Sequence, residues 1–364
     1  MVKKSVDEVI LSPFQRHHKL FEGVAAIKEF FLKQGFLEVY PPPMVENPGM
    51  ETHIFPFKVK SLRKNKEKNK DKKKKKEIGF LQTSPEFEMK GLLGEGFEQI
   101  FALNYSFRDE EALSDYHRFQ FLLLEWYRAN CCYDSLKEDC VNLLRFLVEK
   151  LECSPNFQIN KAFNSLFGPT SASTSSSSIF KFHNLNLNIP VRSISSLFQE
   201  YLGFCILDFL EIQELKRKIE LDFPKYYDPT VHLLWEDWFF LLFLNEIEPY
   251  LKSYPVLFLD LWPTPLAALS EASKEDPRQA YRFELLLHGV EVANCFQELT
   301  DYKEQRRRFS KQRAEKKNLY GYTLPIPKKF YQTLKVGLPK SSGIALGVER
   351  LLSCLHEGNP NLFY

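Results

Sequence analysis

The sequence predicts an α+β fold, an antiparallel sheet flanked by helices, and three segments carry this prediction. Residues 13–34 repeat apolar residues at helical spacing. Residues 101–108 and 119–128 alternate like the two strands of a hairpin, and residues 343–348 alternate between small and bulky side chains. No internal repeat is evident, so we expect one folded domain over residues 1–364.

The composition excludes several classes of protein. Of the 364 residues, 44% are hydrophobic and 15% aromatic, which suffices for a large core and excludes a disordered chain. The longest unbroken apolar run, residues 238–244, is far shorter than the roughly 20 residues of a membrane span. The first eight residues lack the apolar centre of a secretory signal, so we expect a cytoplasmic protein without a membrane partner. Seven cysteines without a C-x-x-C pair predict reduced thiols rather than a zinc site.

Two low-complexity tracts interrupt the chain. Residues 58–77 contain twelve Lys or Arg and three acidic residues, so this segment carries +9 and the rest of the chain −7 of the formal total of +2. Such a run cannot bury itself and predicts a disordered, solvated insertion, with residues 55–57 and 80–82 pairing as strands around it. A nucleic-acid contact is the alternative. The Ser/Thr-rich residues 168–180 predict a flexible connector.

A helix followed by a proline-terminated strand is expected near the N-terminus. Ser12 can cap this helix, and Pro13 suits its first position. The apolar positions that follow are three or four residues apart, namely Leu20, Val24, Ile27 and Phe31. Gly35 would end the helix, and the prolines at residues 41–43, which lack amide donors, would stop the strand after it.

The predicted hairpin brings an arginine and several acids to one end of the sheet. Its first strand has an apolar face, which we expect to be core, made of Phe101, Leu103, Tyr105 and Phe107. The other face is small and polar and ends in Arg108. The second strand groups Phe121, Leu123, Glu125 and Tyr127 on one face. The loop between the strands carries Asp109, Glu110, His117 and Arg118.

Two C-terminal strands complete the set of candidate residues. One face of the strand at residues 343–348 is almost bare, with Gly343, Ala345 and Gly347, while Ile344, Leu346 and Val348 anchor the other face. A bare strand face lets a planar ligand or another backbone approach closely, and Arg350 follows it. Residues 290–298 place Glu291, Ala293 and Cys295 on one side and lead to Glu298. Arginines suit phosphate, whereas carboxylates suit a divalent metal or a ligand ammonium group.

These motifs resemble those of the class II aminoacyl-tRNA synthetases. Residues 12–43 resemble motif 1, residues 107–110 with the long strand after them resemble motif 2, and residues 343–350 resemble motif 3, all in order. Within that superfamily, the chain is similar to the bacterial lysyl-tRNA synthetase paralogues that attach (R)-β-lysine to elongation factor P. The segments that carry this similarity are residues 83–90, 124–128, 289–301 and 334–337.

The resemblance implies an AMP-forming ligase that uses ATP and Mg²⁺. The implied catalytic residues are Arg108, Arg350 and Glu291. The implied ATP-binding residues are Arg108, Asp109, Glu110, His117, Arg118, Phe121, Glu291, Val292, Gly347 and Arg350. The implied amino-acid-binding residues are Ser84, Pro85, Glu86, Glu125, Tyr127, Glu298 and Ala345, and the implied metal ligands are Glu291 and Glu298.

The resemblance also implies partners. Ala345 stands where lysyl-tRNA synthetases have glycine, and an added methyl in a packed pocket costs about 1–3 kcal/mol, which favours β-lysine over α-lysine. Elongation factor P is then the expected acceptor. Motif 1 begins within about the first dozen residues, so we expect no anticodon-binding domain before it and no stable tRNA binding. The family pairs through motif 1, which implies a homodimer.

Some positions depart from the family pattern. Arg118 and Gln120 replace Asn and Glu, which bears on the ATP contacts of the loop, and Cys295 replaces a glycine, which bears on the shape of the pocket. Two other readings stay open at this point. One is a synthetase-like ligase that acylates tRNA or another amine, and the other is a catalytically silent regulatory paralogue.

Overall fold

The computed structural model describes residues 12–62, 77–109, 117–167 and 189–356. Their centre is an eight-stranded sheet in the order β1-β5-β6-β11-β10-β9-β8-β7. The bounds along that order are β1 Leu37–Glu38, β5 Gln99–Phe107, β6 Gln120–Ala129, β11 Ser341–Gly347, β10 Val290–Gln297, β9 Gln279–Leu287, β8 Val256–Pro263 and β7 Val191–Ser193. The six central strands, from β5 to β8 in this order, are antiparallel to one another, as predicted. The edge strands β1 and β7 pair in parallel with β5 and β8.

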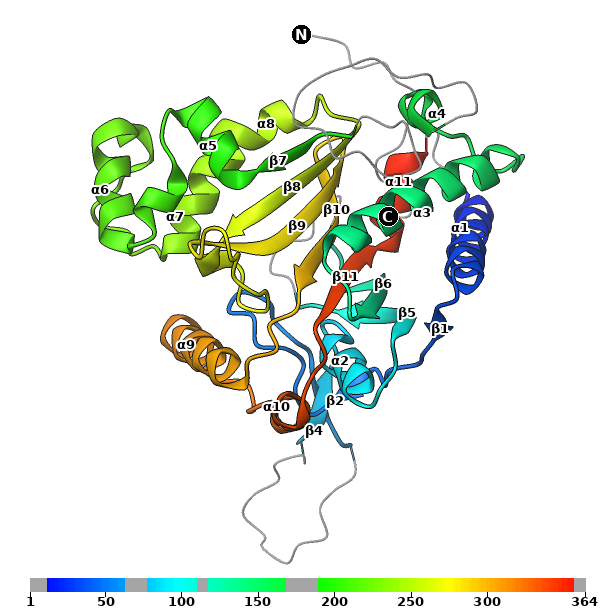
Figure 1. The fold of residues 1–364 in the computed structure, drawn as a ribbon, viewed down its shortest axis with the longest axis horizontal. Helices are drawn as coiled ribbons and strands as arrows, with labels where there is room; N and C mark the ends of the chain where they lie inside the picture. Colours follow the sequence, from blue (N-terminus) through cyan, green and yellow to red (C-terminus); the bar gives the residue numbers. More distant parts are fainter. Residues whose placement is uncertain (1–11, 63–76, 110–116, 168–188, 357–364) are drawn as a thin grey trace, which may run out of the picture.

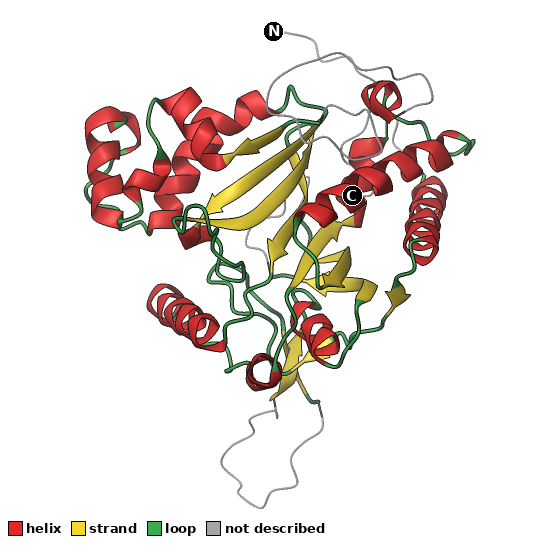
Figure 2. Ribbon diagram, in the orientation of Figure 1, coloured by secondary structure: helices red, strands yellow, loops and turns green. Residues whose placement is uncertain are grey.

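Helices cover the sheet in three groups (Figures 1 and 2). The first group, α1 Pro13–Lys33, α3 Asp134–Glu152, α4 Lys161–Phe167 and α11 Val348–Leu355, packs around the main core. The second, α5 Ile194–Leu202, α6 Ile212–Asp222, α7 Trp235–Leu242 and α8 Glu248–Leu251, gathers at the β7 end around Trp238 and Trp262. The third, α2 Glu86–Gly94, α9 Tyr302–Tyr320 and α10 Lys328–Val336, packs where Phe87 stacks on Phe330. Short irregular helices are Ile206–Phe209, Pro224–Tyr226, Phe243–Ile247 and Thr264–Leu266.

The N-terminal prediction is confirmed. Ser12 caps α1 through a capping box with Gln15, which satisfies two amides at the helix start. Ile27 and Phe31 are fully buried in the main core, and the helix ends before Gly35, whose φ of 80° suits glycine. None of the helices in the described part of the chain combines the length and the hydropathy that a membrane span requires.

The hairpin prediction is also confirmed, with one error. β5 and β6 pair in register from Gln99 with Arg128 to Phe107 with Gln120. Phe101 is fully buried, but Tyr105 is 49% exposed, so the face that we expected to be core is open toward the end of β5. The error arises because β5 lies next to the sheet edge, where β1 pairs only with Ile100 and Phe101.

A second small sheet frames the lysine-rich tract. It contains β2 Met44–Val45, β4 Glu77–Leu81 and β3 Lys58–Lys60, in the order β2-β4-β3. Residues 55–57 and 80–82 meet as expected, since Leu81 N donates to Phe57 O at 2.9 Å. The strand that pairs with β4, however, is Lys58–Lys60 and not residues 55–57. The predicted insertion at 58–77 is therefore wrong at both ends, where backbone pairing outweighs composition. Residues 63–76, and 168–180 of the predicted connector, lie outside the described residues.

Candidate active site

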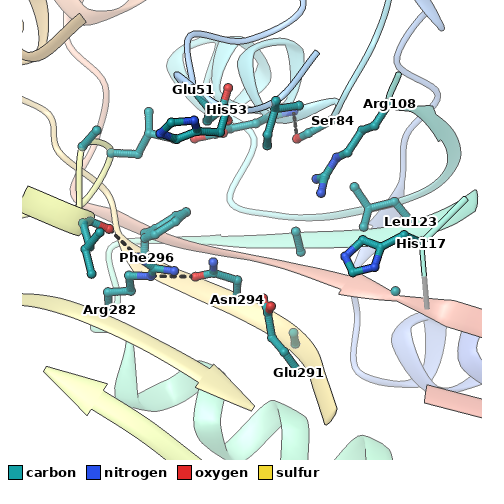
Figure 3. A pocket seen from close by; sticks show the side chains of 18 of the residues that line it. Glu51, His53, Ser84, Arg108, His117, Leu123, Arg282, Glu291, Asn294 and Phe296 are labelled. Atoms are coloured by element: carbon teal, nitrogen blue, oxygen red, sulfur yellow. Dashed lines mark hydrogen bonds between the residues drawn. The ribbon is translucent and has the colours of Figure 1, made fainter. Parts of the chain in front are cut away.

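A cavity of about 450 Å³ opens on one face of the sheet and is large enough for a nucleotide or an amino acid. Strands β6, β10 and β11, the loop at residues 51–54 and helix α9 contribute to its wall. Figure 3 shows Arg108 pointing into this cavity, with Glu291 across from it. The predicted site residues that line it are Ser84, Glu86, Arg108, His117, Arg118, Phe121, Glu291, Val292, Ala345, Gly347 and Arg350. Residues from four distant parts of the sequence therefore meet in one site.

Arg108 follows β5 and is held by the hairpin. Its amide donates to Phe119 O at 3.0 Å, and the amide of Asp109 donates to Phe55 O at 2.7 Å. The guanidinium lies 5.1 Å from the centre of the Phe121 ring, so the cation and the aromatic face share one wall. Glu110 lies outside the described residues.

The bare end of β11 is open at Gly347. The nearest atoms that a Cβ atom built there would meet belong to the Arg350 side chain, at 3.7 Å or more. Glu349 is buried and accepts the Leu122 amide on both carboxylate oxygens, at 2.9 and 3.0 Å, which ties α11 to β6. Arg350 donates from Nη1 to Glu291 O at 3.2 Å. Arg108 and Arg350 thus line the same cavity as the exposed backbone of Gly347.

A bulge in β10 determines which side of the sheet the Glu291 carboxylate faces. The register with β9 shifts between Glu291 and Ala293. Glu291 is therefore exposed to the cavity, while Ala293 and Cys295 are buried in the main core. The expectation that these three residues share a side is wrong, because simple alternation does not anticipate an extra residue.

Glu284 on β9 is a candidate functional residue that the sequence reasoning missed. It pairs with Arg282 at 2.5 Å, and Arg282 also donates to Asn294 Oδ1 at 3.2 Å (Figure 3). Burial, and then the negative charge of Glu291, raise the pKa of Glu284 to about 8. The sequence signal was a single acid within an otherwise apolar strand end, Phe283 to Leu287.

Glu284 and Glu291 are the candidate ligands for a divalent cation in this cavity. Among the described residues, no group of three or more His, Cys, Asp or Glu side chains could hold a metal. Mg²⁺ usually takes one or two carboxylates and completes its shell with water and substrate phosphates. Glu291 lines the cavity, and its negative charge contributes to the raised pKa of Glu284 on the neighbouring strand, so these two acids fit that description.

A second group of acids lies at the start of α2 and across the neighbouring strands. Ser84 donates to Glu125 Oε1 at 2.5 Å, and the Tyr127 hydroxyl donates to Glu125 Oε2 at 3.1 Å. Pro85 is at the N-cap of α2 and Glu86 is its first residue. Lys90, one helical turn on, pairs with Glu86 and with Glu298 Oε2, the latter at 2.5 Å. We call Glu86, Glu125, Glu298, Lys90 and Tyr127 the amine pocket, after the ligand groups that the sequence resemblance implies for this site.

Burial dominates the electrostatics of the amine pocket. It raises the pKa of Glu125 and of Glu298 to about 8 and also raises the pKa of Glu86. Burial alone would lower the pKa of Lys90, but attraction to Glu298 and Glu86 outweighs it and raises that pKa. One ammonium thus faces three carboxylates, and the pocket has a surplus of negative charge once the acids ionise.

The family is decided by comparison with known proteins. The family model of class II tRNA synthetases (D, K and N) matches residues 13–359. The chain belongs to this family. It is 32% identical over 337 residues to the elongation factor P–(R)-β-lysine ligase of Proteus mirabilis, covering 90% of this chain and 87% of that one. The enzymes of the same name from Buchnera aphidicola and Haemophilus influenzae are 32% and 30% identical, over 90% and 93% of this chain and 88% and 90% of theirs.

This class II synthetase-family chain is an ATP-dependent ligase, since its relatives are ligases and the matched domain is that of ATP-using synthetases. Its sheet, with motif 2 on β5 and β6 and motif 3 on β11 and α11, is the fold that the sequence predicted.

The face of β11 that was predicted to be bare differs in one respect from that prediction. It is divided, because Tyr127 covers Gly343. A Cβ atom at Gly343 would lie 2.1 Å from Tyr127 Cε1 and 2.5 Å from Glu298 Oε1. Gly343 therefore makes room for the amine pocket, whereas Ala345 and Gly347 face the cavity.

Two further expectations need correction. Glu291 and Glu298 stand at opposite ends of β10, about 20 Å apart at the usual rise of a strand, so they cannot bind the same metal ion. Glu298 pairs with Lys90 and belongs to the amine pocket.

Cys295 is completely buried in the main core, so its substitution for glycine does not shape the cavity wall. Arg118 does line the cavity, and Gln120 begins β6.

Proposed function

We propose that this protein activates (R)-β-lysine with ATP and transfers it to a lysine side chain of elongation factor P. The observation that carries the proposal is the amine pocket, where two buried carboxylates, Glu125 and Glu298, and the half-buried Glu86 surround one lysine and leave a charge of −2 when ionised. A diamino acid brings two ammonium groups, which match that charge. The names of the relatives supply the acceptor and favour the β-isomer.

ATP would occupy the other part of the cavity. The adenine would stack on Phe121, and the guanidiniums of Arg108 and Arg350 would bind its phosphates, because arginine matches phosphate oxygens with two parallel hydrogen bonds. Glu291 and Glu284 would hold Mg²⁺, which would stabilise the negative charge on the pyrophosphate leaving group. Gly347 would let the nucleotide approach the strand backbone.

The reaction then needs two displacements. A carboxylate oxygen of β-lysine attacks the α-phosphorus, and the bond to pyrophosphate breaks, which leaves the aminoacyl adenylate in the cavity. A neutral lysine amine of elongation factor P attacks the acyl carbon, AMP leaves and the amine loses a proton. The chain contributes position and charge stabilisation through Arg108 and Arg350, so no covalent intermediate on the enzyme is required.

Ala345 supports the choice of β-lysine. It pairs with Glu125 on β6 and with Asn294 on β10, so its methyl shares a sheet face with both side chains. That position lies between the amine pocket and the nucleotide end of the cavity. The extra methyl would hinder an amine on the α-carbon, at a cost of about 1–3 kcal/mol, more than an amine on the β-carbon.

A homodimer is part of the proposal. The outer face of α1 and the adjoining sheet edge expose large apolar side chains, which is typical of a subunit interface. They are Phe14, Phe21, Leu32, Leu37, Tyr40 and Tyr105. We also propose a cytoplasmic protein that forms no stable complex with tRNA. Sedimentation of the pure protein and a gel-shift titration with tRNA test the first and last of these statements.

The proposal is tested by mass spectrometry of elongation factor P after incubation with this protein, ATP and β-lysine. We expect a gain of one lysyl residue on one lysine, absent with Arg108→Ala. A strong preference for α-lysine, or transfer to tRNA in place of the factor, would favour a synthetase-like ligase with another acceptor. Failure to bind ATP in the presence of Mg²⁺ would instead favour a silent paralogue.

A further inference from the structure

Lys90 is a buried cation inside the amine pocket to which the proposed function gives no role of its own. It is 1% exposed, and its ammonium lies 5.6 Å from the centre of the Phe330 ring on α10. It pairs with one carboxylate on its own helix, Glu86, and with one beyond the end of β10, Glu298. A lone lysine ammonium is costly to bury, so both contacts are needed to keep it charged.

The contacts of Lys90 leave a defined set of acceptor atoms for a ligand. The Lys90 ammonium pairs with Oε1 of Glu86 and with Oε2 of Glu298. Glu125 uses both of its oxygens, one for Ser84 and one for Tyr127. Within the described residues, Glu298 Oε1 is buried without a hydrogen-bond partner, and Glu86 lines the cavity. One oxygen on each of two carboxylates therefore remains, which is one acceptor for each ammonium group of a diamino acid.

The charges that face Lys90 can be counted element by element. Helix α2 contributes Glu86, β6 contributes Glu125 and the Tyr127 hydroxyl, and the residue after β10 contributes Glu298. Glu51 adds a further negative charge near Glu86 from the loop before β3. Without Lys90 the three pocket carboxylates would carry −3, one more than a diamino acid can neutralise.

We infer that Lys90 is a built-in counter-cation that limits the charge of the amine pocket to −2 once its acids ionise, orients Glu86 and Glu298, and thereby makes the pocket specific for substrates with two ammonium groups. Lys90 acts through these two carboxylates and is a positioning residue for them. The identity of the diamino acid as β-lysine rests on the proposed function, whereas the role of Lys90 holds for any ligand with two amines.

The experiment compares Lys90→Met and Lys90→Arg with the matched control Lys137→Met. Lys137 is also 1% exposed and also bridges two acids, Asp134 and Asp260, but it lies outside the cavity lining. It therefore reproduces the cost of losing a buried lysine. The measured quantities are the KM for β-lysine and the KM for ATP in ATP–pyrophosphate exchange between pH 6.5 and about 9.5, and the midpoint of thermal unfolding.

For the wild type, we expect the KM for β-lysine to fall as the pH rises through about 8, where Glu125 and Glu298 ionise. In Lys90→Met the pH at which this KM falls should be higher by about one unit or more, because the lost ammonium no longer favours the ionised form of the acids. Lys90→Arg should restore the wild-type profile, and Lys137→Met should leave it unchanged. The KM for ATP should stay within about twofold throughout, since the nucleotide binds elsewhere in the cavity.

The inference is overturned if Lys90→Met loses stability as Lys137→Met does while its pH profile remains that of the wild type. If Lys90→Met does not fold, the double variant Lys90→Met with Glu86→Gln takes its place, because it restores a charge of −2. Its profile should lie within about half a unit of the wild type, and a shift as large as one unit would contradict the charge count.

Failure of the proposed function would look different. If the wild type activates α-lysine and not β-lysine, the substrate assignment is wrong, but the same variants tested with α-lysine still decide the role of Lys90. If calorimetry detects no binding of either diamino acid to the wild type, the inference is overturned together with the proposed function.

Discussion

Replacing Glu125 with glutamine should stabilise the unliganded protein at high pH, and the size of the effect follows from burial. Glu125 is fully buried, and burial raises its pKa from 4.5 to about 8. Between these values the folded chain keeps a proton that the unfolded chain releases, so the free energy of unfolding falls as the pH rises. Each pH unit costs at most about 1.4 kcal/mol, and the whole interval costs on the order of 5 kcal/mol.

Glu125→Gln removes that loss, because a neutral amide resembles the protonated acid and can still accept from Ser84 or Tyr127. The free energies of unfolding of the variant and the wild type, from urea titrations, should nearly coincide at pH 5 and differ by several kcal/mol at pH 8.5. Glu220→Gln on α6, an exposed acid, is the control and should show no difference. Equal pH dependence in Glu125→Gln and the wild type would refute the reasoning that burial controls this group.

Three further substitutions separate the two ends of the cavity. Arg108→Ala should abolish ATP–pyrophosphate exchange while circular dichroism and the unfolding midpoint stay unchanged, and retained exchange would remove Arg108 from the nucleotide site. Gly347→Val should raise the KM for ATP by about tenfold or more, because the Cβ space at Gly347 is where the nucleotide meets the backbone; an unchanged KM would place the nucleotide elsewhere. Gly343→Ala should raise the KM for the diamino acid and leave ATP binding intact, because its methyl would lie 2.1 Å from Tyr127 Cε1. Equal effects on both substrates would contradict the division of β11.

Local sequence signals sufficed for much of the fold. Ser12 and Pro13 satisfy the start of α1 through their own chemistry, and the spacing to Phe31 identifies its buried face, so no distant contact had to be known. The alternation of Gly347 with Leu346 likewise reports which face of β11 is anchored. The resemblance to synthetase motifs then grouped strands that are far apart in the chain, which periodicity alone could not do.

The features that the sequence reasoning missed depend on distant contacts. The bulge beside Val292 adds one residue without changing the composition, so alternation assigned Cys295 to the wrong side. Lys90 follows Glu86 at the spacing of an exposed helical ion pair, and only the approach of Glu298 from another strand shows that it is buried. Tyr105 looked like a core residue because the sequence does not show how short its neighbour β1 is.

A crystal structure with a non-hydrolysable β-lysyl adenylate analogue tests the central claim most directly. We predict one ammonium group within hydrogen-bond distance of Glu86 Oε2 and the other on Glu298 Oε1, the adenine on the Phe121 ring, and Lys90 still between its two acids. An analogue bound with either amine away from these carboxylates, or with its phosphate far from Arg108 and Arg350, would contradict the account.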